Sequence, residues 1–449
     1  MVTDSTIHAQ AREMRDAARE IFRQALSQAS IEGAFSRHVH CERGILRVCE
    51  DLFDLNSYAR VLIVSLGKAG HTMAEALTRQ IGQPGPENSL AGIVATCVTP
   101  SAQLRGFRYF FGGHPTPNAE SVAAATAILK VLEAQSAASL VIFLVSGGGS
   151  SIVERPIDDE ISLDDLIATY GALVHSSAPI AEINAIRKHL SAVKGGRLAR
   201  AAFPAQQLSL LVSDVPDITP DALASGPTMP DSTSAEDCYR VAEKHDLLAH
   251  LPNSTRELFE RRALDETPKS DDQVFYRSRF WTILSNGIAL EQARAAAERA
   301  GFSVCIDNTC DDWNYAAAAD YLLKRVRELR AATSGARICL LSGGEVTVKV
   351  TNGGIGGRNQ QFVLACAAKI AEENITVLSA GTDGIDGNSP AAGAIADGTT
   401  LARGRNVGLD AERSLDDFNA YSFFSALNDA IEIGPTGNNL RDVRILLAY

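Results

Sequence analysis

Six apolar runs, each ending in serine and a turn-forming stretch, constrain the fold of this 449-residue chain more than any other feature. They are VLIVSLGKAG (61–70), VIFLVSGGGSS (141–151), LSLLVSDVPD (208–217), WTILSNG (281–287), ICLLSGGE (338–345) and ITVLSAGTDGIDG (375–387). A run that is apolar at every position is typical of a strand buried on both faces. Helix-forming sequence lies between the runs, and strands that alternate with helices predict parallel sheets covered by helices.

A stretch rich in turn residues, from Ser225 to about Asn253, divides this pattern into two halves. The alternation of strands and helices restarts after it, and a chain of this length is long enough for two cores. We therefore predict two α/β domains, residues 1–245 and 246–449, with largely parallel sheets flanked by helices and an active-site cleft between them. A long amphipathic helix from Thr6 to about Ser30 precedes the first strand.

The charge balance and the cysteines exclude several classes of function. Lys and Arg total 42 against 54 Asp and Glu, a formal net charge of −12, which argues against binding to nucleic acid or to a membrane surface. Eight cysteines lie scattered without CxxC spacing, which suits reduced thiols. The sequence opens on acidic residues without an apolar signal segment, so we expect a cytoplasmic protein. Its oligomeric state stays open, with a homodimer among the options.

The run over residues 141–151 ends in three glycines and two serines. Bare backbone N–H groups after a strand can cradle a phosphate, whereas a tight turn that needs positive φ requires only one glycine. The succession of glycines therefore favours a phosphate contact. We assign to the nucleotide a loop made of Ser146, Gly147, Gly148, Gly149 and Ser150.

Lys68 lies between two glycines, directly after a strand and at the expected start of a helix. A lysine at this position is suited to act as a point charge on a phosphate or carboxylate. An ordinary solvated lysine does not need Gly67 and Gly70 around it, so we favour a functional role.

The stretch EINAIRKHLSAVKGGRLARAA (182–202) has helical periodicity, with apolar residues on one face. Its opposite face carries Asn184, Arg187 and Lys188 beside small residues. Such a polar face is usually only solvated, but the small residues suggest that a ligand approaches closely. We assign these three side chains to substrate binding and Lys194 to the nucleotide.

Asp214 follows the run LSLLVS, where a carboxylate can hold Mg²⁺ or orient a hydroxyl. The alternative is an ordinary turn residue whose side chain bonds to its own backbone. Farther along, Ser225 and Gly226 are candidates for a second backbone nest, and we assign Gly226 to nucleotide binding.

The second half carries a similar set of polar residues after glycines. Glu345 follows two glycines, and Arg358 and Asn359 follow the glycine-rich segment 353–357. Because arginine can grip a carboxylate or phosphate with two hydrogen bonds, these three residues are predicted to contact substrate or the transferred group.

Asp383 and Asp386 lie three residues apart in the glycine-rich segment GTDGIDG. Two carboxylates in such a loop fit a divalent ion or sugar hydroxyls, and hairpin-like turn chemistry is the alternative. We assign Asp214 and Asp383 as the candidate metal ligands.

Neither standard nucleotide signature, GxxxxGK[ST] or GxGxxG, occurs in the sequence. In open parallel sheets, ligands bind beyond the carboxyl ends of the strands, and the lysine, glycine loop, carboxylate and arginine all map to such ends. Phosphoryl transfer needs positioned charges and Mg²⁺ rather than a covalent nucleophile, so this set of residues favours a kinase.

Over nearly its whole length the chain resembles class II glycerate 2-kinases, which have an N-terminal glycerate kinase domain and a C-terminal domain known as MOFRL. The motifs that carry the resemblance are, in order, SLGKA, GGHPTPN, SGGGSS, EINAIRKHLSAVKGGRLA, SDVPD, ASGPTMPD, LSGGEVTV, GGRNQ, AGTDGIDG and GPTGNN. What the resemblance implies is ATP-dependent phosphorylation of D-glycerate at its 2-hydroxyl, with Mg²⁺, in a cleft between the domains. The family's active-site lysine and arginine match Lys68 and Arg358.

On this basis we expect three catalytic residues. Lys68 and Arg358 neutralise the transferring phosphoryl group or hold the glycerate carboxylate, and Asp214 orients or deprotonates the attacking hydroxyl. The serine–glycine loop cradles the ATP phosphates, and Asp383 helps to hold Mg²⁺ or substrate.

Three other functions remain open from the sequence. A hydroxypyruvate reductase dependent on NAD(P)H also needs a small hydroxy-acid site, but the missing GxGxxG argues against it. A non-catalytic sensor of sugar acids does not need a cation, a carboxylate and a phosphate cradle together. A kinase of a related hydroxy acid is the third alternative.

Overall fold

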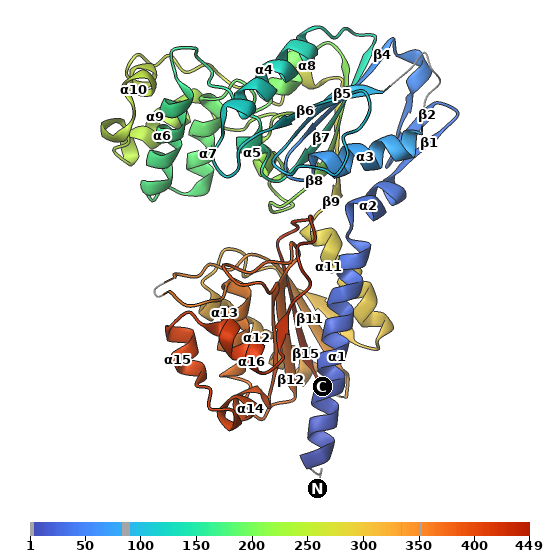
Figure 1. The fold of residues 1–449 in the computed structure, drawn as a ribbon, viewed down its shortest axis with the longest axis vertical. Helices are drawn as coiled ribbons and strands as arrows, with labels where there is room; N and C mark the ends of the chain where they lie inside the picture. Colours follow the sequence, from blue (N-terminus) through green and yellow to red (C-terminus); the bar gives the residue numbers. More distant parts are fainter. Residues whose placement is uncertain (1–3, 83–89, 334, 351–352) are drawn as a thin grey trace. The chain divides into compact units, whose positions relative to one another are not determined.

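The computed structural model describes residues 4–82, 90–333, 335–350 and 353–449, and it divides into two compact units. We call residues Ile31–Ile283 the N-terminal unit, and Met1–Ser30 together with Leu284–Tyr449 the C-terminal unit. Figure 1 shows the helices and strands of both. The predicted existence of two α/β units is confirmed, whereas the predicted cleft between them stays a prediction.

The boundary between the units differs from the predicted one at residue 245. Residues after it still belong to the N-terminal unit, because Leu251 and Phe259 pack into a core cluster with Leu166 and Leu173. The first 30 residues belong to the C-terminal unit, although they precede the other unit in the sequence. A linear division of the chain cannot express this arrangement.

The N-terminal unit contains a small antiparallel sheet and a larger one. The elements around the small sheet are α2 (Ile31–His38), β1 (Val39–Glu42), β2 (Ile45–Val48) and β3 (Asp51–Asp54). The rest are β4 (Arg60–Leu66), α3 (Gly70–Ile81), β5 (Ala91–Thr96), β6 (Phe107–Phe111), α4 (Ala119–Glu133), β7 (Ser139–Ser146), α5 (Gly149–Ile152), α6 (Leu163–His175), α7 (Ile180–His189), α8 (Arg197–Ala202), β8 (Gln206–Val212), α9 (Ala235–Lys244), α10 (Asn253–Glu260) and β9 (Ser278–Leu284).

The larger sheet has the strand order β6-β5-β4-β7-β8-β9, and the pairs from β6 to β8 are parallel. Its central strand β7 is buried at every position, as the unbroken apolar run predicts. Val64 and Phe143 pack in one cluster with Ile128 of α4 and Leu198 of α8, while α3 packs against β4, β5 and β7 (Figure 1). The predicted parallel sheet with covering helices is therefore present in this unit.

The predicted single helix over residues 182–202 is instead two helices, α7 and α8. α7 ends at His189 and α8 begins at Arg197, and the two residues directly before α8, Gly195 and Gly196, have left-handed φ angles of 54° and 80°. This conformation cannot continue a right-handed helix. The two N–H groups turn to other partners, since Gly195 N donates to Ser225 O at 3.0 Å and Gly196 N to Gly226 O at 2.8 Å.

The C-terminal unit is a mixed sheet between two layers of helices. Its elements are α1 (Asp4–Gln28), α11 (Asn286–Arg299), β10 (Ser303–Ile306), α12 (Tyr315–Ala332), β11 (Ile338–Gly344), α13 (Arg358–Ala367), β12 (Ile375–Gly381), β13 (Gly393–Asp397), α14 (Thr400–Asn406), α15 (Ala411–Asp416), α16 (Ala420–Ala426), β14 (Ala430–Ile431) and β15 (Asp442–Ala448). The strand order is β10-β11-β15-β12-β13-β14.

This second sheet departs from the prediction of largely parallel sheets. Only β10 and β11 form a parallel pair, while β15 lies between β11 and β12 and is antiparallel to both. Because both neighbours run opposite to β15, their carboxyl ends lie at the same edge of the sheet, where β15 begins at Asp442. The carboxyl ends of β11 and β12 thus lie at one edge of the sheet, as the prediction requires, and β15 adds Asp442 to that edge.

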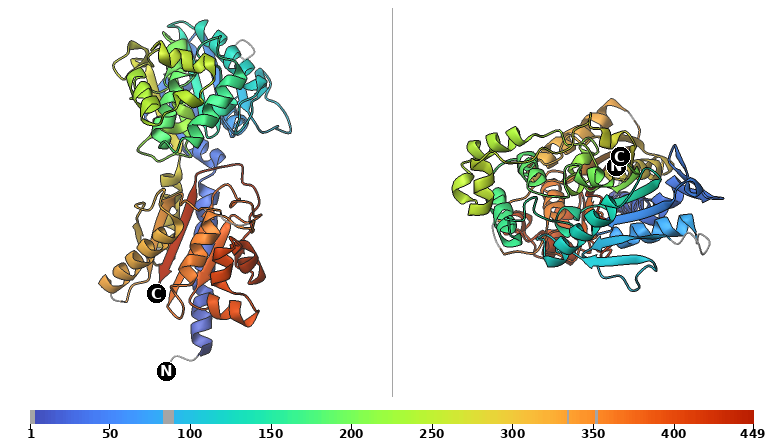
Figure 2. Two further views of the ribbon diagram at one scale, coloured as in Figure 1. Left: turned by 90° about the vertical axis from the view of Figure 1, so that its left-hand side faces the viewer. Right: turned by 90° about the horizontal axis from the view of Figure 1, so that it is seen from above.

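Alternating side chains along β12 and β15 point into the two cores. Leu378 and Ile445 pack against α1 and α11, whereas Val377 and Leu446 pack against α12, α13 and α16. In Figure 2, α1 runs along the sheet, and Arg15 on this helix binds both Asp397 and Asp429. These contacts hold the first helix in the C-terminal unit.

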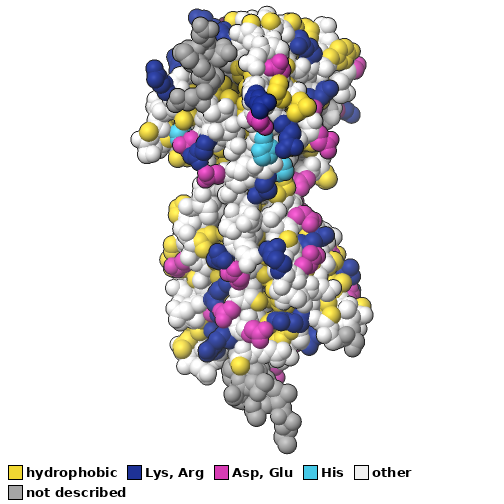
Figure 3. Space-filling model, turned by 90° about the vertical axis from the view of Figure 1, so that its right-hand side faces the viewer, with side chains coloured by type: hydrophobic (Ala, Val, Ile, Leu, Met, Phe, Trp, Pro, Cys, Tyr) yellow, Lys and Arg dark blue, Asp and Glu magenta, His cyan; other side chains and the backbone are white. Residues whose placement is uncertain are grey.

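The surface carries both signs of charge. On the face drawn in Figure 3, basic and acidic side chains alternate over both units, and hydrophobic side chains are scattered among them. None of the helices within the described ranges combines the length and the apolar character that a membrane crossing requires.

Candidate active site

Lys68, the glycine loop and Asp214 lie together at one edge of the N-terminal unit. They follow β4, β7 and β8, which are adjacent and parallel, so their carboxyl ends share that edge. Lys68 N donates to Gly147 O at 2.9 Å, and Ala69 N donates to Ser146 Oγ at 3.1 Å. The side chain of Ser146, one of the predicted loop residues, therefore links the end of β7 to the segment that follows β4.

Close neighbours explain why this loop has no side chains. A Cβ atom at Gly147 would collide with the Asp214 carboxylate. At Gly148, where φ is 79°, a Cβ atom would lie 3.0 Å from Lys68 Cγ and 3.3 Å from His114 Nδ1. The half-buried carboxylate of Asp214 thus lies against Gly147, and the exposed side chain of Lys68 lies against Gly148. Such a site can receive an anion together with a cation that bridges it to the carboxylate.

His114 was not among the predicted site residues, although Ser150 of the glycine loop was. His114 Nδ1 lies 3.1 Å from Ser151 Oγ, and Ser150 Oγ lies 3.0 Å from Ser225 Oγ. Partial burial and the nearby Lys68 charge lower the pKa of His114, which favours a neutral imidazole. The motif GGHPTPN contains this histidine, but nothing in the sequence alone places it against the loop after β7.

The ammonium group of Lys194 is already paired inside the protein. It forms a buried ion pair with Glu154, whose other oxygen accepts a hydrogen bond from Ser191 Oγ at 2.6 Å. Tyr170 OH also donates to Glu154, at 2.7 Å. Burial lowers the pKa of Lys194 and the Glu154 charge opposes this shift. Because binding a phosphate would break this pair, we remove Lys194 from the candidate site.

A Lys194→Met variant tests this structural role. It leaves Glu154, which has 0% exposure, without its positive partner, and removing one member of a buried pair costs roughly 3–5 kcal/mol of unfolding free energy. Urea denaturation measures the loss. The double variant Glu154→Gln/Lys194→Met recovers part of it, because it buries no unpaired charge. An unchanged unfolding free energy in Lys194→Met contradicts the assignment.

The other basic residues predicted for the site, Arg187 and Lys188 on α7, differ in their contacts. Lys188 is buried and bonds to Asp221 at 2.9 Å and Asp231 at 3.1 Å, so it is already neutralised. The Arg187 guanidinium carbon lies 5.0 Å from the centre of the Tyr170 ring. The predicted substrate residues of this helix thus include one lysine that serves the protein's own structure.

Gly226 and Asn184 complete the predicted set in this unit. The Gly226 N–H donates to Leu223 O at 2.9 Å, so it is not available to a phosphate, contrary to the prediction. Asn184 is half-buried on α7, and its assignment to substrate stays a prediction.

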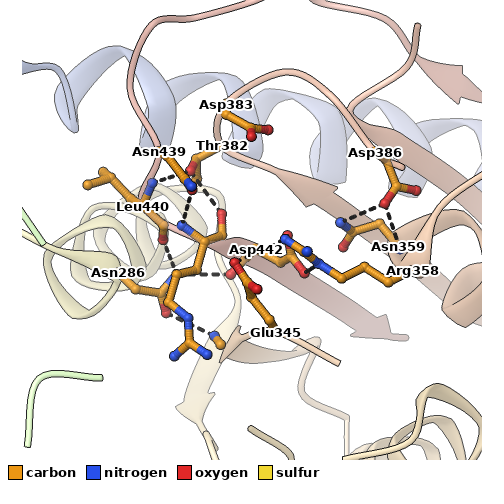
Figure 4. Close-up of polar contacts among 12 residues, drawn as sticks. Asn286, Glu345, Arg358, Asn359, Thr382, Asp383, Asp386, Asn439, Leu440 and Asp442 are labelled. Carbon is orange, nitrogen blue, oxygen red and sulfur yellow. Dashed lines mark hydrogen bonds and ion pairs between the residues drawn. The ribbon is translucent and has the colours of Figure 1, made fainter. Parts of the chain in front are cut away.

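Arg358 is the centre of the polar cluster in the C-terminal unit (Figure 4). Its Nε and Nη2 donate to the two carboxylate oxygens of Asp442 at 2.7 and 2.9 Å, and Nη2 lies 3.1 Å from Glu345 Oε1. Burial alone would lower the pKa of Arg358, but the bonds and charges of these carboxylates raise it. These contacts fix the guanidinium plane and do not involve Nη1.

Asn359 and Asp386 form a second, buried group beside this arginine. Asp386 accepts hydrogen bonds from Asn359 N at 3.1 Å and Gln360 N at 2.9 Å. The Asn359 side chain is itself occupied, with its oxygen accepting from Ser379 Oγ. Because Asn359 is fully buried, its predicted contact with substrate is replaced by a structural one. Asp386 likewise binds backbone N–H groups rather than a metal ion or a sugar.

Asp383 lies in the same loop, and no contact joins it to Arg358 in Figure 4. Its Oδ1 accepts from Ile385 N at 3.1 Å, which is the turn chemistry considered as the alternative for this residue. The described part of the chain contains no cluster of three or more acidic, histidine or cysteine residues suited to a metal ion. Asp214 and Asp383 belong to different units, so the structure does not bring the two predicted metal ligands together within one unit.

Asn286 supports the edge of this site and was not predicted. Its side chain donates to Leu440 O at 2.7 Å and Asp442 O at 2.9 Å, and it accepts from Gly344 N at 3.1 Å. It therefore ties the start of β15 to the end of β11, next to Glu345. The run WTILSNG indicated a polar residue after a strand, but not this contact.

Comparison with known proteins assigns the chain to a family. Residues 17–260 match a domain family described as a domain of unknown function (DUF4147), and residues 338–442 match the MOFRL family. A D-glycerate 2-kinase of Thermotoga maritima is 34% identical over 390 residues, covering 86% of this chain and 90% of the relative. The chain belongs to the glycerate 2-kinase family. The MOFRL match includes Glu345, Arg358 and Asp442.

Two further relatives extend this comparison. The crystal structure of a glycerate kinase from Thermotoga maritima superimposes with a TM-score of 0.84 at 31% identity, covering 98% of this chain and 100% of that one. A protein of Agrobacterium vitis that carries the provisional name hydroxypyruvate reductase is 35% identical and covers 86% of this chain and 87% of the relative. The chain is thus similar to proteins that carry either name.

Proposed function

We propose that this member of the glycerate 2-kinase family transfers the γ-phosphoryl group of ATP to the 2-hydroxyl of D-glycerate, giving 2-phosphoglycerate and ADP. One observation carries the proposal. The side chains of Lys68 and Asp214 flank consecutive glycines of a bare loop at the carboxyl ends of parallel strands. This arrangement places a cation and a carboxylate beside bare backbone, and positioned charges of this kind are what phosphoryl transfer uses.

We assign the ATP phosphates to the loop of Gly147, Gly148 and Gly149. Lys68 contributes a mobile point charge there, which lowers the cost of bringing another anion to the γ-phosphate. His114 is a neutral hydrogen-bonding group beside the same loop, with Ser151 as its partner. It extends the polar surface without adding a second fixed charge.

Asp214 is proposed to orient or deprotonate the attacking hydroxyl and to contribute to a Mg²⁺ site. Mg²⁺ commonly binds one or two protein carboxylates and completes its shell with phosphates and water, so the single carboxylate above Gly147 fits this ion. When bound, Mg²⁺ neutralises charge on the phosphates. Asp383 is left out of this proposal, because its side chain closes a turn.

Arg358 is proposed to act on the transferring phosphoryl group or the glycerate carboxylate. Asp442 and Glu345 hold Nε and Nη2, so the side chain needs little further ordering when an anion approaches Nη1. We therefore assign Asp442 and Glu345 to the orientation of Arg358.

A coupled assay separates this function from the alternatives. We expect ADP release that requires both D-glycerate and ATP, and no NADH oxidation with hydroxypyruvate. NADH oxidation without ADP release supports the reductase function instead, which the provisional name of the Agrobacterium relative raises. Binding of D-glycerate without turnover of either kind supports a sensor. The absence of GxGxxG from the sequence favours the kinase.

A further inference from the structure

Helix α13 begins with an N-cap that its own sequence does not supply. Its N-cap residue is Gly357, which has no side chain to accept a hydrogen bond. The carboxylate of Asp386, 29 residues farther along the chain, accepts from the N–H groups of Asn359 and Gln360 instead. These are the second and third residues of a helix whose first residue is Arg358.

The cap is built into the structure from both sides. A Cβ atom at Gly357 would collide with the Asp386 carboxyl group, so glycine there makes room for it. Asp386 O accepts from Ser389 Oγ at 2.9 Å, and the same hydroxyl accepts from Gln360 Nε2 at 2.6 Å. The Asp386 loop and the first turn of α13 therefore hold each other in one position.

Stability alone does not explain an ionised carboxylate here. Asp386 is 2% exposed, and burial raises its pKa to about 6, although the N–H groups of Gln360 and Asn359 and the charge of Arg358 oppose the shift. The charge of Asp442 adds to the rise. A raised folded-state pKa favours folding below the ordinary pKa of 3.8, and this contribution is lost as the pH rises through about 6. At neutral pH the fold thus keeps a charge that costs stability.

We propose that Asp386 is a positioning residue for Arg358: by capping α13 from another loop, it fixes the first helical turn so that the guanidinium meets Asp442 and Glu345. The proposal rests on the role given to Arg358 under the proposed function. The cap bonds the two residues that follow Arg358, and the pair with Asp442 bonds its side chain, so the arginine is fixed at both ends. Without the cap, the backbone on either side of Arg358 is no longer held in this position.

The variant Asp386→Asn tests this proposal, with Asp410→Asn as the matched control. Asp410 caps α15 in the same unit by accepting from Arg413 N, and it is exposed. We expect Asp386→Asn to lower kcat by about 10- to 100-fold, because small displacements of a catalytic group have effects of this size. The KM values for ATP and D-glycerate stay within about twofold, since the loss of an interaction made only in the transition state lowers kcat without raising KM. Asp410→Asn keeps the wild-type kcat.

The pH dependence and amide exchange separate positioning from a merely structural role. Wild-type kcat falls as the pH drops through about 6, because the Asp386 carboxylate takes up a proton there. The kcat of Asp386→Asn does not show this fall. The melting temperature of Asp386→Asn relative to wild type rises as the pH increases from about 4 to about 6 and then stays level, because the variant lacks the buried charge. Hydrogen exchange of a peptide spanning residues 357–363 becomes faster in the variant. Wild-type kcat in Asp386→Asn overturns the proposal.

A double-mutant cycle with Arg358→Gln decides whether the effect passes through the arginine. We expect Asp386→Asn to lower kcat little or not at all in the Arg358→Gln background. Fully additive losses overturn the positioning role. If wild-type protein shows no glycerate kinase activity, the proposed function fails by itself. The inference is then judged by exchange alone: an unchanged exchange rate over residues 357–363 in Asp386→Asn overturns it, and faster exchange supports the cap.

Discussion

Replacing Lys68 by alanine is expected to lower kcat/KM by roughly 10²- to 10³-fold, the size of effect seen when one preorganised donor to developing charge is removed. Lys68 follows β4 and lies over Gly148. The other basic residues of the predicted site in the N-terminal unit already make internal contacts: Lys188 with Asp221, Lys194 with Glu154 and Arg187 with the Tyr170 ring. Steady-state kinetics with D-glycerate and ATP measure the loss.

Lys130→Ala is the matched control for this variant. Lys130 is exposed in the last turn of α4, in the same unit as Lys68. We expect the Lys130→Ala enzyme to keep wild-type kinetics. Because Lys68 is exposed, its replacement leaves the melting temperature almost unchanged, so the loss of activity cannot arise from unfolding. A Lys68→Ala enzyme with the wild-type kcat/KM would show that the glycine loop acts without this cation.

Arg358→Gln is expected to have the larger effect, with kcat falling by roughly 10³- to 10⁵-fold, as for arginines that act on a phosphoryl-transfer transition state. Glutamine keeps hydrogen-bonding capacity but loses the charge and the planar fork. The Arg358→Lys variant keeps the charge and loses only the fork, so we expect it to recover a small part of the activity. Single-turnover kinetics measure the chemical step directly.

This variant needs a control for folding. The Asp442 side chain is 0% exposed, and leaving it unpaired costs roughly 3–5 kcal/mol of unfolding free energy. The double variant Arg358→Gln/Asp442→Asn removes the unpaired charge, so it regains stability while it stays inactive. Activity that returns together with stability would mean that Arg358 serves only the fold.

The strand ends were predictable from the sequence because burial on both faces leaves a strong pattern. The apolar runs predicted β4, β7, β8, β11 and β12, and a serine followed by turn-forming residues marked where each one ends. Since parallel strands end at one edge, this was sufficient to bring Lys68, Asp214 and the glycine loop together. No measured distance was needed for that inference.

Partners from distant parts of the chain were not predictable in the same way. Lys188 and Lys194 have the same local signature as solvated lysines, and only the fold brings Asp231 and Glu154 to them. Between α7 and α8, Gly195 N bonds to Ser225 O and Gly196 N bonds to Gly226 O, and the helical period gives no sign of these distant partners. Likewise, nothing in the spacing of Asp383 and Asp386 distinguishes a metal site from the cap of another helix.

The last strand shows the same limit at the level of topology. β15 reads DVRILLA and does not end in serine and a turn, so the pattern of the predicted strands did not identify it. Its insertion between β11 and β12 brings Asp442 to Arg358, a pairing across 84 residues of sequence. Sequence reasoning identified the arginine but not the carboxylate that orients it.

Phosphorus NMR of the product formed from D-glycerate, ATP and Mg²⁺ tests the central proposal most directly. The 2- and 3-phosphoglycerate isomers differ in their phosphorus environment, so one spectrum reports both the transfer and its position. The proposed function predicts 2-phosphoglycerate together with ADP, in a reaction that the Lys68→Ala enzyme performs far more slowly. A 3-phosphoglycerate product contradicts the assigned hydroxyl, and no phosphorylated glycerate at all contradicts the kinase.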